Sequence, residues 1–130
     1  MPAYESMWFD PPAPIARVVV RSPIDGASVA DVPLLMDSGA DVSLLPAGFV
    51  RALVDERELS EHYELQGFDG RRSSAPARRL EVHFLGKVFR GQFLVVEQDY
   101  GILGRNILNF LSLHLDGPNL AWNERETVLR

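Results

Sequence analysis

The sequence contains no cysteine, no long apolar run and no excess of basic residues. Without cysteine, neither a disulfide nor a thiolate metal site is possible. No apolar stretch approaches the roughly 20 residues that a membrane-spanning helix needs, so no membrane partner is expected. The net charge of -5 argues against a nucleic acid partner, because phosphate is usually bound by a basic face. The first residues lack the basic start and apolar run of a signal peptide, and we expect a reducing, cytoplasmic location.

Several kinds of catalytic or cofactor site are also missing. No glycine-rich phosphate loop precedes a helix, and no GxSxG elbow presents a serine nucleophile. The histidines are isolated and lack the spacing of a metal site; they are His62, His83 and His114. We therefore expect no metal and no cofactor.

What is present suits one domain with its own core, since the chain has 130 residues of which 46% are hydrophobic. We expect an extended N-terminal arm over residues 1–14, the domain proper over 15–123 and a polar tail over 124–130. Prolines keep the arm from forming a helix; they are Pro2, Pro11, Pro12 and Pro14. The arm is therefore either a loose tail or an edge strand.

Short β-branched and apolar segments, separated by turn residues, predict about eight strands. They lie at residues 15–22, 29–36, 43–45, 62–66, 78–84 and 88–96 and on both sides of a turn at 116–119. Apolar residues at helical spacing predict two short helices, over 47–54 and 107–111. Gly86-Lys87 predicts a hairpin turn, and the polar stretch 70–77 is a loop or part of a hairpin tip. This pattern is typical of an all-β barrel or sandwich.

The most informative segment is Leu-Leu-Met-Asp-Ser-Gly-Ala-Asp-Val-Ser-Leu-Leu-Pro, residues 34–46. Its apolar strand delivers Asp37 into a turn that contains Ser38 and Gly39. A carboxylate placed directly after buried apolar residues costs desolvation energy unless it is hydrogen-bonded or functional. Gly39 allows close backbone approach, and the Ser38 hydroxyl can lock the turn. Taken alone, however, Asp-Ser-Gly favours a plain β-turn, which is what we expect at 25–26, 69–70 and 116–117.

A second segment, Ile102-Leu103-Gly104-Arg105-Asn106, favours by itself a glycine turn that leads into a helix. Together, the two segments resemble the signatures of the retropepsins, the retroviral and retrotransposon-type aspartic proteases, and of their bacterial and cellular relatives. Asp37-Ser38-Gly39-Ala40-Asp41 is similar to the Asp-Thr/Ser-Gly-Ala signature, and the second segment to the one that precedes the C-terminal helix. Their order and separation also agree, and the resemblance extends from about residue 15 to 123.

The resemblance implies a single-domain retropepsin-like barrel with one or two short helices, active as a symmetric homodimer. Asp37 would be catalytic, in a loop formed with Ser38-Gly39-Ala40. Asp41 and Arg105 would form an ion pair that braces this loop; two solvated surface charges are the plain alternative. Ile102-Leu103-Gly104 would support the substrate pocket beside the loop.

The resemblance also implies a flap, at Gly67-Phe68-Asp69-Gly70, which in the family closes over an extended substrate. Four arginines lie near this flap in the sequence: Arg71, Arg72, Arg78 and Arg79. They either form a charged surface in contact with solvent or favour the binding of acidic substrates. The family's terminal strands interleave in the dimer, whereas here the tail forms its own hairpin. Candidate interface residues are Trp8, Phe9, Trp122 and Leu129, with a core role as the alternative for Trp122.

The activity implied is that of an aspartic endopeptidase acting on extended peptide or protein substrates. One carboxylate is the base for the attacking water while the other protonates the scissile carbonyl, and in such proteases the two share one proton. The chain has one Asp-Ser-Gly and no room for a second lobe, so a second copy must supply the other aspartate.

Two other functions compete with this one. The first is a catalytically silent binding or dimerisation module on the same fold, favoured only by the unusual flap residues Phe68 and Asp69. The second is a serine hydrolase that uses Ser38 with one of the histidines; the missing elbow argues against it.

Overall fold

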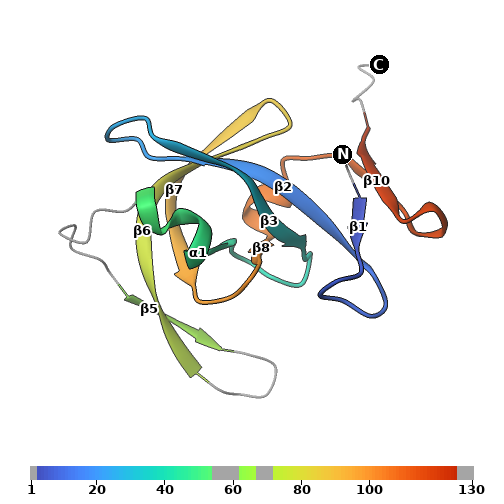
Figure 1. Ribbon diagram of the computed structural model, residues 1–130, viewed down its shortest axis with the longest axis horizontal. Coiled ribbons are helices and arrows are strands. Elements are labelled where there is room, and N and C mark those ends of the chain that lie inside the picture. The colour runs from blue at the N-terminus through green and yellow to red at the C-terminus, as the bar shows by residue number, and fades with distance from the viewer. Residues whose placement is uncertain (1–2, 54–61, 67–71, 126–130) are drawn as a thin grey trace.

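The structure is a computed structural model that describes residues 3–53, 62–66 and 72–125 (Figure 1). Its strands are β1 (Ala3–Glu5), β2 (Ala13–Arg21), β3 (Ser28–Met36), β4 (Leu44–Pro46), β5 (His62–Gln66), β6 (Arg72–Phe84), β7 (Lys87–Val96), β8 (Gly101–Leu103), β9 (Leu113–Asp116) and β10 (Ala121–Glu124). The helices are α1 (Ala47–Val50) and α2 (Arg105–Leu108), with 3-10 turns η1 (Arg51–Leu53) and η2 (Gly117–Asn119). Within the described ranges, no helix has the length and apolar character to cross a membrane.

Six of the strands close a ring. Going around it, β2 pairs with β6, β6 with β7, β7 with β4, β4 with β8, β8 with β3, and β3 with β2. The β4–β7 and β3–β8 pairs are parallel and the other four are antiparallel. The ring is therefore a mixed barrel with two short helices, and the predicted all-β barrel is confirmed.

The core that fills this barrel consists mainly of aliphatic side chains from the ring strands, to which β7 adds Phe93. On β6 apolar residues alternate with polar ones, and Leu80, Val82 and Phe84 point inside. The helices close the barrel by burying Val50 and Ile107. Burying a side chain of this size contributes about 1.5–3 kcal/mol.

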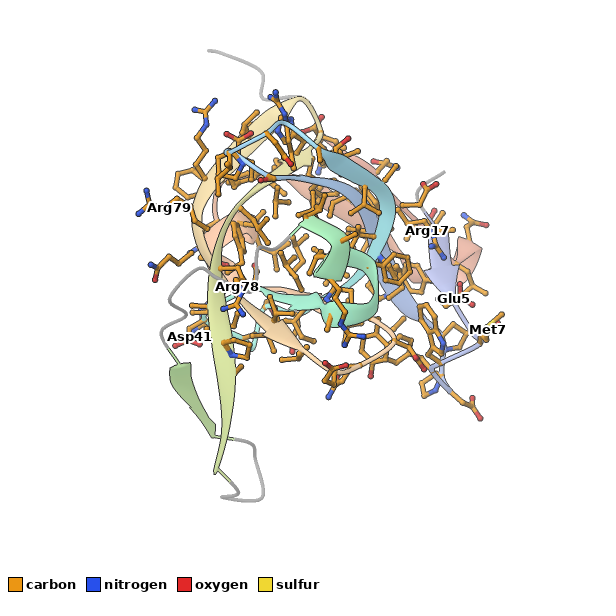
Figure 2. All side chains as sticks on the ribbon, turned by 60° about the vertical axis from the view of Figure 1, so that its left-hand side comes forward. Glu5, Met7, Arg17, Asp41, Arg78 and Arg79 are labelled. Atoms are coloured by element: carbon orange, nitrogen blue, oxygen red, sulfur yellow. The ribbon has the colours of Figure 1, made fainter. Side chains whose placement is uncertain are left out.

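The terminal strands β1, β10 and β9 continue the barrel's sheet outward from β2, at the right of Figure 1, and are called the terminal sheet here. β1 pairs with β2 on one side and with β10 on the other, and β10 pairs with β9. An ion pair of 3.5 Å joins Glu5 of β1 to Arg17 of β2 (Figure 2). Neither of the two alternatives predicted for the arm, a loose tail or an edge strand, holds over residues 3–5. These residues form an inner strand, because β1 is paired on both sides.

Trp122 attaches this terminal sheet to the barrel. Its indole is 4% exposed and packs against Phe84, with ring centroids 5.7 Å apart. The indole Nε1–H donates to the backbone carbonyl of Ile15 (3.0 Å), which satisfies its buried polar group. Of the two roles predicted for Trp122, the structure shows the core role.

Three other predictions need correction. Gly101–Leu103 is a strand, β8, although the sequence has no strand pattern there. The polar stretch 72–77 belongs to β6 and pairs with β5, so it is not a loop. The hairpin turn between β6 and β7 is Leu85-Gly86, one residue earlier than predicted, and both residues have positive φ (52° and 75°). Such a two-residue turn matches the twist of the strands, which outweighs the cost of a left-handed Leu85.

The seam where β2 meets β6 is covered by a charge cluster. Arg21, Glu81 and Arg90 stand opposite one another on β2, β6 and β7. Arg90 Nε donates to Glu81 Oε2 (2.8 Å), His83 Nε2 lies 3.2 Å from Oε1, and Arg21 Nη1 lies 4.0 Å from Oε1. The Glu81 side chain is 10% exposed. The hydrogen bonds from Arg90 and then His83 hold the pKa of Glu81 below its ordinary value of 4.5.

This cluster makes the seam sensitive to acid. Because the folded pKa of Glu81 lies below the unfolded one, the ionised carboxylate stabilises the fold at pH above the unfolded pKa. That stabilisation is lost as pH falls through the folded pKa. We expect Glu81→Gln to lower Tm at about pH 7 and to reduce the fall in Tm between about pH 6 and pH 3.

The measurement is thermal unfolding followed by circular dichroism across this pH range. Glu97→Gln is the control, because Glu97 forms an exposed pair with Arg51 (2.7 Å) and such pairs contribute only about 0–1 kcal/mol. An unchanged pH dependence of Tm in Glu81→Gln would contradict the role given to the seam.

Candidate active site

Asp37 is the first residue after β3, and its position is set by the neighbouring strand. β3 and β8 run parallel, with Met36 opposite Leu103. The Asp37 backbone N–H continues this pairing by donating to the Leu103 carbonyl (3.0 Å). The Asp37 side chain is half-buried, at the point where the strand leaves the apolar core. The barrel therefore holds the backbone of Asp37 while its carboxylate stays accessible.

The turn that follows fixes the direction of the carboxylate. The Gly39 N–H donates to Asp37 Oδ1 (2.9 Å), and the Ala40 N–H donates to the Asp37 carbonyl (3.1 Å). A Cβ on Gly39 would lie 3.0 Å from Asp37 Oδ1, so a side chain there would crowd the carboxylate. Asp37, Ser38, Gly39 and Ala40 thus form one hydrogen-bonded loop, and its catalytic role stays a prediction. The Ser38 hydroxyl makes no hydrogen bond with any described residue, so it does not lock the turn.

Arg105 holds the same loop from the start of α2. Its backbone N–H donates to the Ala40 carbonyl (2.8 Å), and its Nη1 donates to the Ser38 carbonyl (2.7 Å). The predicted ion pair with Asp41 is wrong, because Asp41 forms no salt bridge within the described ranges and is exposed (Figure 2). The guanidinium bonds a backbone oxygen of the loop instead, and this contact is independent of the Asp41 side chain.

Ser43 makes a second link between the two segments, which the sequence reasoning missed. Its hydroxyl accepts the Gly104 N–H (2.9 Å) and donates to Asn106 Oδ1 (2.7 Å). Ser43 is 2% exposed; its bond to Gly104 is buried, and its bond to Asn106 is partly buried. The signal available was the single hydroxyl in the otherwise apolar stretch 42–46, together with the polar residue Asn106 in the second segment.

Gly104 brings the segments into direct contact. A Cβ on this residue would run into the backbone carbonyl of Val42 and lie 3.1 Å from that of Ala40. Glycine is therefore required by close backbone approach. Beside it, Leu103 is fully buried and Ile102 is half-buried opposite Leu44. Their support of a substrate pocket stays a prediction.

A recess of about 160 Å³ lies beside Val42 and Ser43, on the side toward β7. It is lined by Val42, Ser43, Ala77, Gln92, Leu94 and Asn106. The predicted flap residues Gly67-Phe68-Asp69-Gly70 lie outside the described residues, as do Arg71 and Leu129. Arg78 is half-buried and donates to the Ala77 carbonyl (3.1 Å), while Arg79 is exposed (Figure 2).

Other candidate chemistry is not assembled around the loop. In the described parts of the chain, no three His, Cys, Asp or Glu side chains gather as a metal site would require. His83 is bonded to Glu81, and neither it nor His114 is hydrogen-bonded to Ser38. Trp8 and Phe9 pack on Tyr100, with ring centroids 5.5 and 4.8 Å apart, and their place in an interface stays a prediction.

Removing the Ser43 hydroxyl tests the link between the segments. Ser43→Ala leaves the buried Gly104 N–H and the Asn106 amide oxygen without this partner, and we expect a loss of about 1–3 kcal/mol in the free energy of unfolding. Urea denaturation measures it. Ser28→Ala, at the exposed start of β3, is the control and should stay within about 0.5 kcal/mol of wild type. Equal stabilities of the two variants would contradict the role of Ser43.

Comparison with known proteins agrees with this geometry at the level of the fold. No family model matches the sequence. Among solved structures, the chain is similar to EIAV protease complexed with the inhibitor HBY-793, with a TM-score of 0.54 and 22% sequence identity. The match covers 75% of this chain and 86% of that one. At this identity the match shows the fold alone, which is retropepsin-like, as the two signatures predicted.

Proposed function

We propose that this chain, with its retropepsin-like fold, is one subunit of a homodimeric aspartic endopeptidase in which each copy contributes Asp37. The observation that carries the proposal is the presentation of Asp37. Its backbone is bonded to β8 and its Oδ1 to the Gly39 N–H, in a loop that Arg105 holds through the Ser38 carbonyl. A carboxylate held by backbone groups reacts without first being reoriented, which is the property that general acid–base catalysis needs.

The chemistry requires two such carboxylates. Two carboxyl groups about 3 Å apart hold one proton between them, because both cannot be ionised at low cost. The ionised carboxylate removes a proton from water while the other donates its proton to the carbonyl oxygen, and a tetrahedral intermediate forms. A proton then passes to the leaving amine as the C–N bond breaks. Since the sequence has one Asp-Ser-Gly, the second carboxylate comes from another copy.

The proposed substrate is a peptide or protein segment in extended conformation. Ile102 and Val42, half-buried and exposed respectively, supply apolar surface beside the loop, which suits apolar residues near the cleaved bond. The bracing of the loop by Arg105 and the substrate support by Ile102-Leu103-Gly104 belong to the same proposal.

Replacing the carboxylate by an isosteric amide tests the mechanism. We expect Asp37→Asn to lower the rate of peptide-library cleavage by roughly 10²–10⁴-fold or more, because the amide cannot accept the proton of water. Wild-type specific activity should fall on dilution, since the site needs two copies. Asp31→Asn is the matched control: Asp31 is exposed on the same strand with φ 58°, a conformation that Asn tolerates. Cleavage that survives Asp37→Asn would overturn the mechanism.

An inhibitor tests whether the two carboxylates come together. A statine-type compound places a hydroxyl where the attacking water would lie, and at 100 times its Kd it should stabilise the protein by about 2.7 kcal/mol. Thermal shift measures this, and Asp37→Asn should lose the shift. No shift and no cleavage in the wild type at any concentration would favour the silent binding module.

A further inference from the structure

Strand β7 has one edge that no described strand covers over most of its length. It pairs with β6 from Lys87 to Leu94, but with β4 only from Leu94 onward. Because a two-residue turn joins β6 to β7, the first pair of the ladder is hydrogen-bonded, and so is every second pair after it. The backbone N–H and C=O groups of Val88 and Arg90 therefore point away from β6, and no other described segment bonds to them.

A groove of about 680 Å³ lies along this open edge. It is lined by every residue from Lys87 to Phe93 on one side, and by Asn106, Ile107 and Phe110 on the other. Consecutive side chains of a strand point to opposite faces, so a groove that contacts all of them runs along the edge of the strand. Its volume is in the range of sites that enclose a ligand.

The face of the groove toward α2 is apolar and has an open place at its centre. Phe89 and Phe110 lie with ring centroids 6.0 Å apart, and Phe110 is 68% exposed. Gly91 lies between Phe89 and Phe93 on the same face of β7, and a Cβ on Gly91 would meet no atom within 4 Å. The glycine therefore leaves room for an apolar side chain from outside the described chain.

The charges along the groove have one sign. Lys87 and Arg90 are the ionisable residues among its described lining, although the chain carries a net charge of -5. The Arg90 side chain is 73% exposed and lies on the face of β7 opposite to Gly91. Its partner Glu81 is also 4.0 Å from Arg21, so two arginines share one carboxylate and positive charge is left over. The groove is thus complementary to an acidic ligand.

We propose that the open edge of β7 binds an extended segment of another polypeptide as an added strand, in which apolar residues alternate with acidic ones. Strand addition gives affinity through backbone hydrogen bonds and specificity through alternate side chains. In this arrangement an apolar side chain fills the place over Gly91, against Phe89 and Phe110. The acidic side chain next to it points to the other face, beside Arg90.

This binding function goes beyond the proposed protease, because the groove does not contain Asp37. The groove shares Asn106 and Gln92 with the recess beside Ser43. Arg105, which precedes Asn106, bonds the Ser38 carbonyl of the Asp37 loop. A segment bound at β7 is therefore held next to the candidate active site without occupying it.

Fluorescence anisotropy with a labelled synthetic peptide of alternating leucine and glutamate tests the site. The protein is the full chain with Asp37→Asn, so that cleavage does not interfere. Adding Gly91→Val fills the open place with a residue that suits a strand, and should raise the Kd by about tenfold or more. The matched control is Gly48→Val, at a glycine of α1 that also has no atom within 4 Å of a Cβ and lies outside the groove.

The control should keep the Kd of the unsubstituted protein, and circular dichroism confirms that both variants are folded. No binding by the unsubstituted protein, or equal Kd values for Gly91→Val and Gly48→Val, would overturn the inference.

Amide hydrogen exchange followed by NMR tests the strand pairing itself. In the free protein the N–H groups of Phe89 and Gly91 bond to β6 and should exchange slowly, whereas those of Val88 and Arg90 should exchange fast. Peptide at 100 times its Kd should slow exchange at Val88 and Arg90 by about 100-fold. Binding that leaves their exchange unchanged would show contact through side chains only and would contradict strand addition.

Peptide variants test the chemistry of the ligand without changing the protein. Lysine in place of glutamate should raise the Kd by about tenfold or more, because Lys87 and Arg90 then face like charges. The same leucines and glutamates grouped in two blocks should also bind more weakly, since neither face of the added strand then matches the groove. Equal Kd values for the glutamate and lysine peptides would contradict an acidic ligand.

Competition in the wild type separates this inference from the proposed function. An excess of the statine-type inhibitor should leave the peptide bound at β7, and displacement would place the peptide at Asp37 and overturn the inference. A wild type that binds the peptide at β7 but never cleaves supports the β7 site and counts against the protease. A wild type that cleaves but does not bind the peptide supports the protease and overturns the β7 site.

Discussion

The insertion of β8 between β3 and β4 is the constraint on which both the barrel and the candidate site depend. This strand of three residues pairs parallel with β3 and antiparallel with β4, so it closes the ring on one side. It fits because Gly101 has no side chain: a Cβ there would run into the Leu44 carbonyl and crowd Leu34 and Pro46. The end of the same strand accepts the Asp37 N–H at Leu103. The same strand, β8, therefore both closes the barrel and fixes the position of Asp37.

The loop that carries Asp37 is held almost entirely through backbone groups. Gly39 and Ala40 bond to Asp37, and Arg105 bonds to the carbonyls of Ser38 and Ala40. Backbone partners do not change rotamer, so the carboxylate keeps its direction without an ion pair at Asp41. The barrel and the backbone of the loop thereby place the acid, while the side chain of Asp41 stays exposed.

Prediction from the sequence succeeded where a local pattern and the tertiary environment agree. β3 ends at Met36 as the apolar run indicated, and Leu80, Val82 and Phe84 are inside because alternation and burial coincide. Prediction failed where a segment becomes a strand only because it pairs with a neighbouring strand. β8 has only three residues and begins with glycine, so it shows no strand pattern, and the polar start of β6 is a strand because it pairs with β5.

The sequence by itself determined the class of fold and pointed to Asp37 as the candidate catalytic residue, because the two signatures carry backbone requirements that few residues satisfy. These are an acid directly after a buried strand, and glycines where two segments of the backbone come close together. The tertiary structure alone decided which partners hold that acid. Arg105 bonds the Ser38 carbonyl, not Asp41, and Ser43 bonds Gly104 and Asn106 across about 60 residues of chain. These choices depend on distances between segments remote in sequence, and no local pattern encodes such distances.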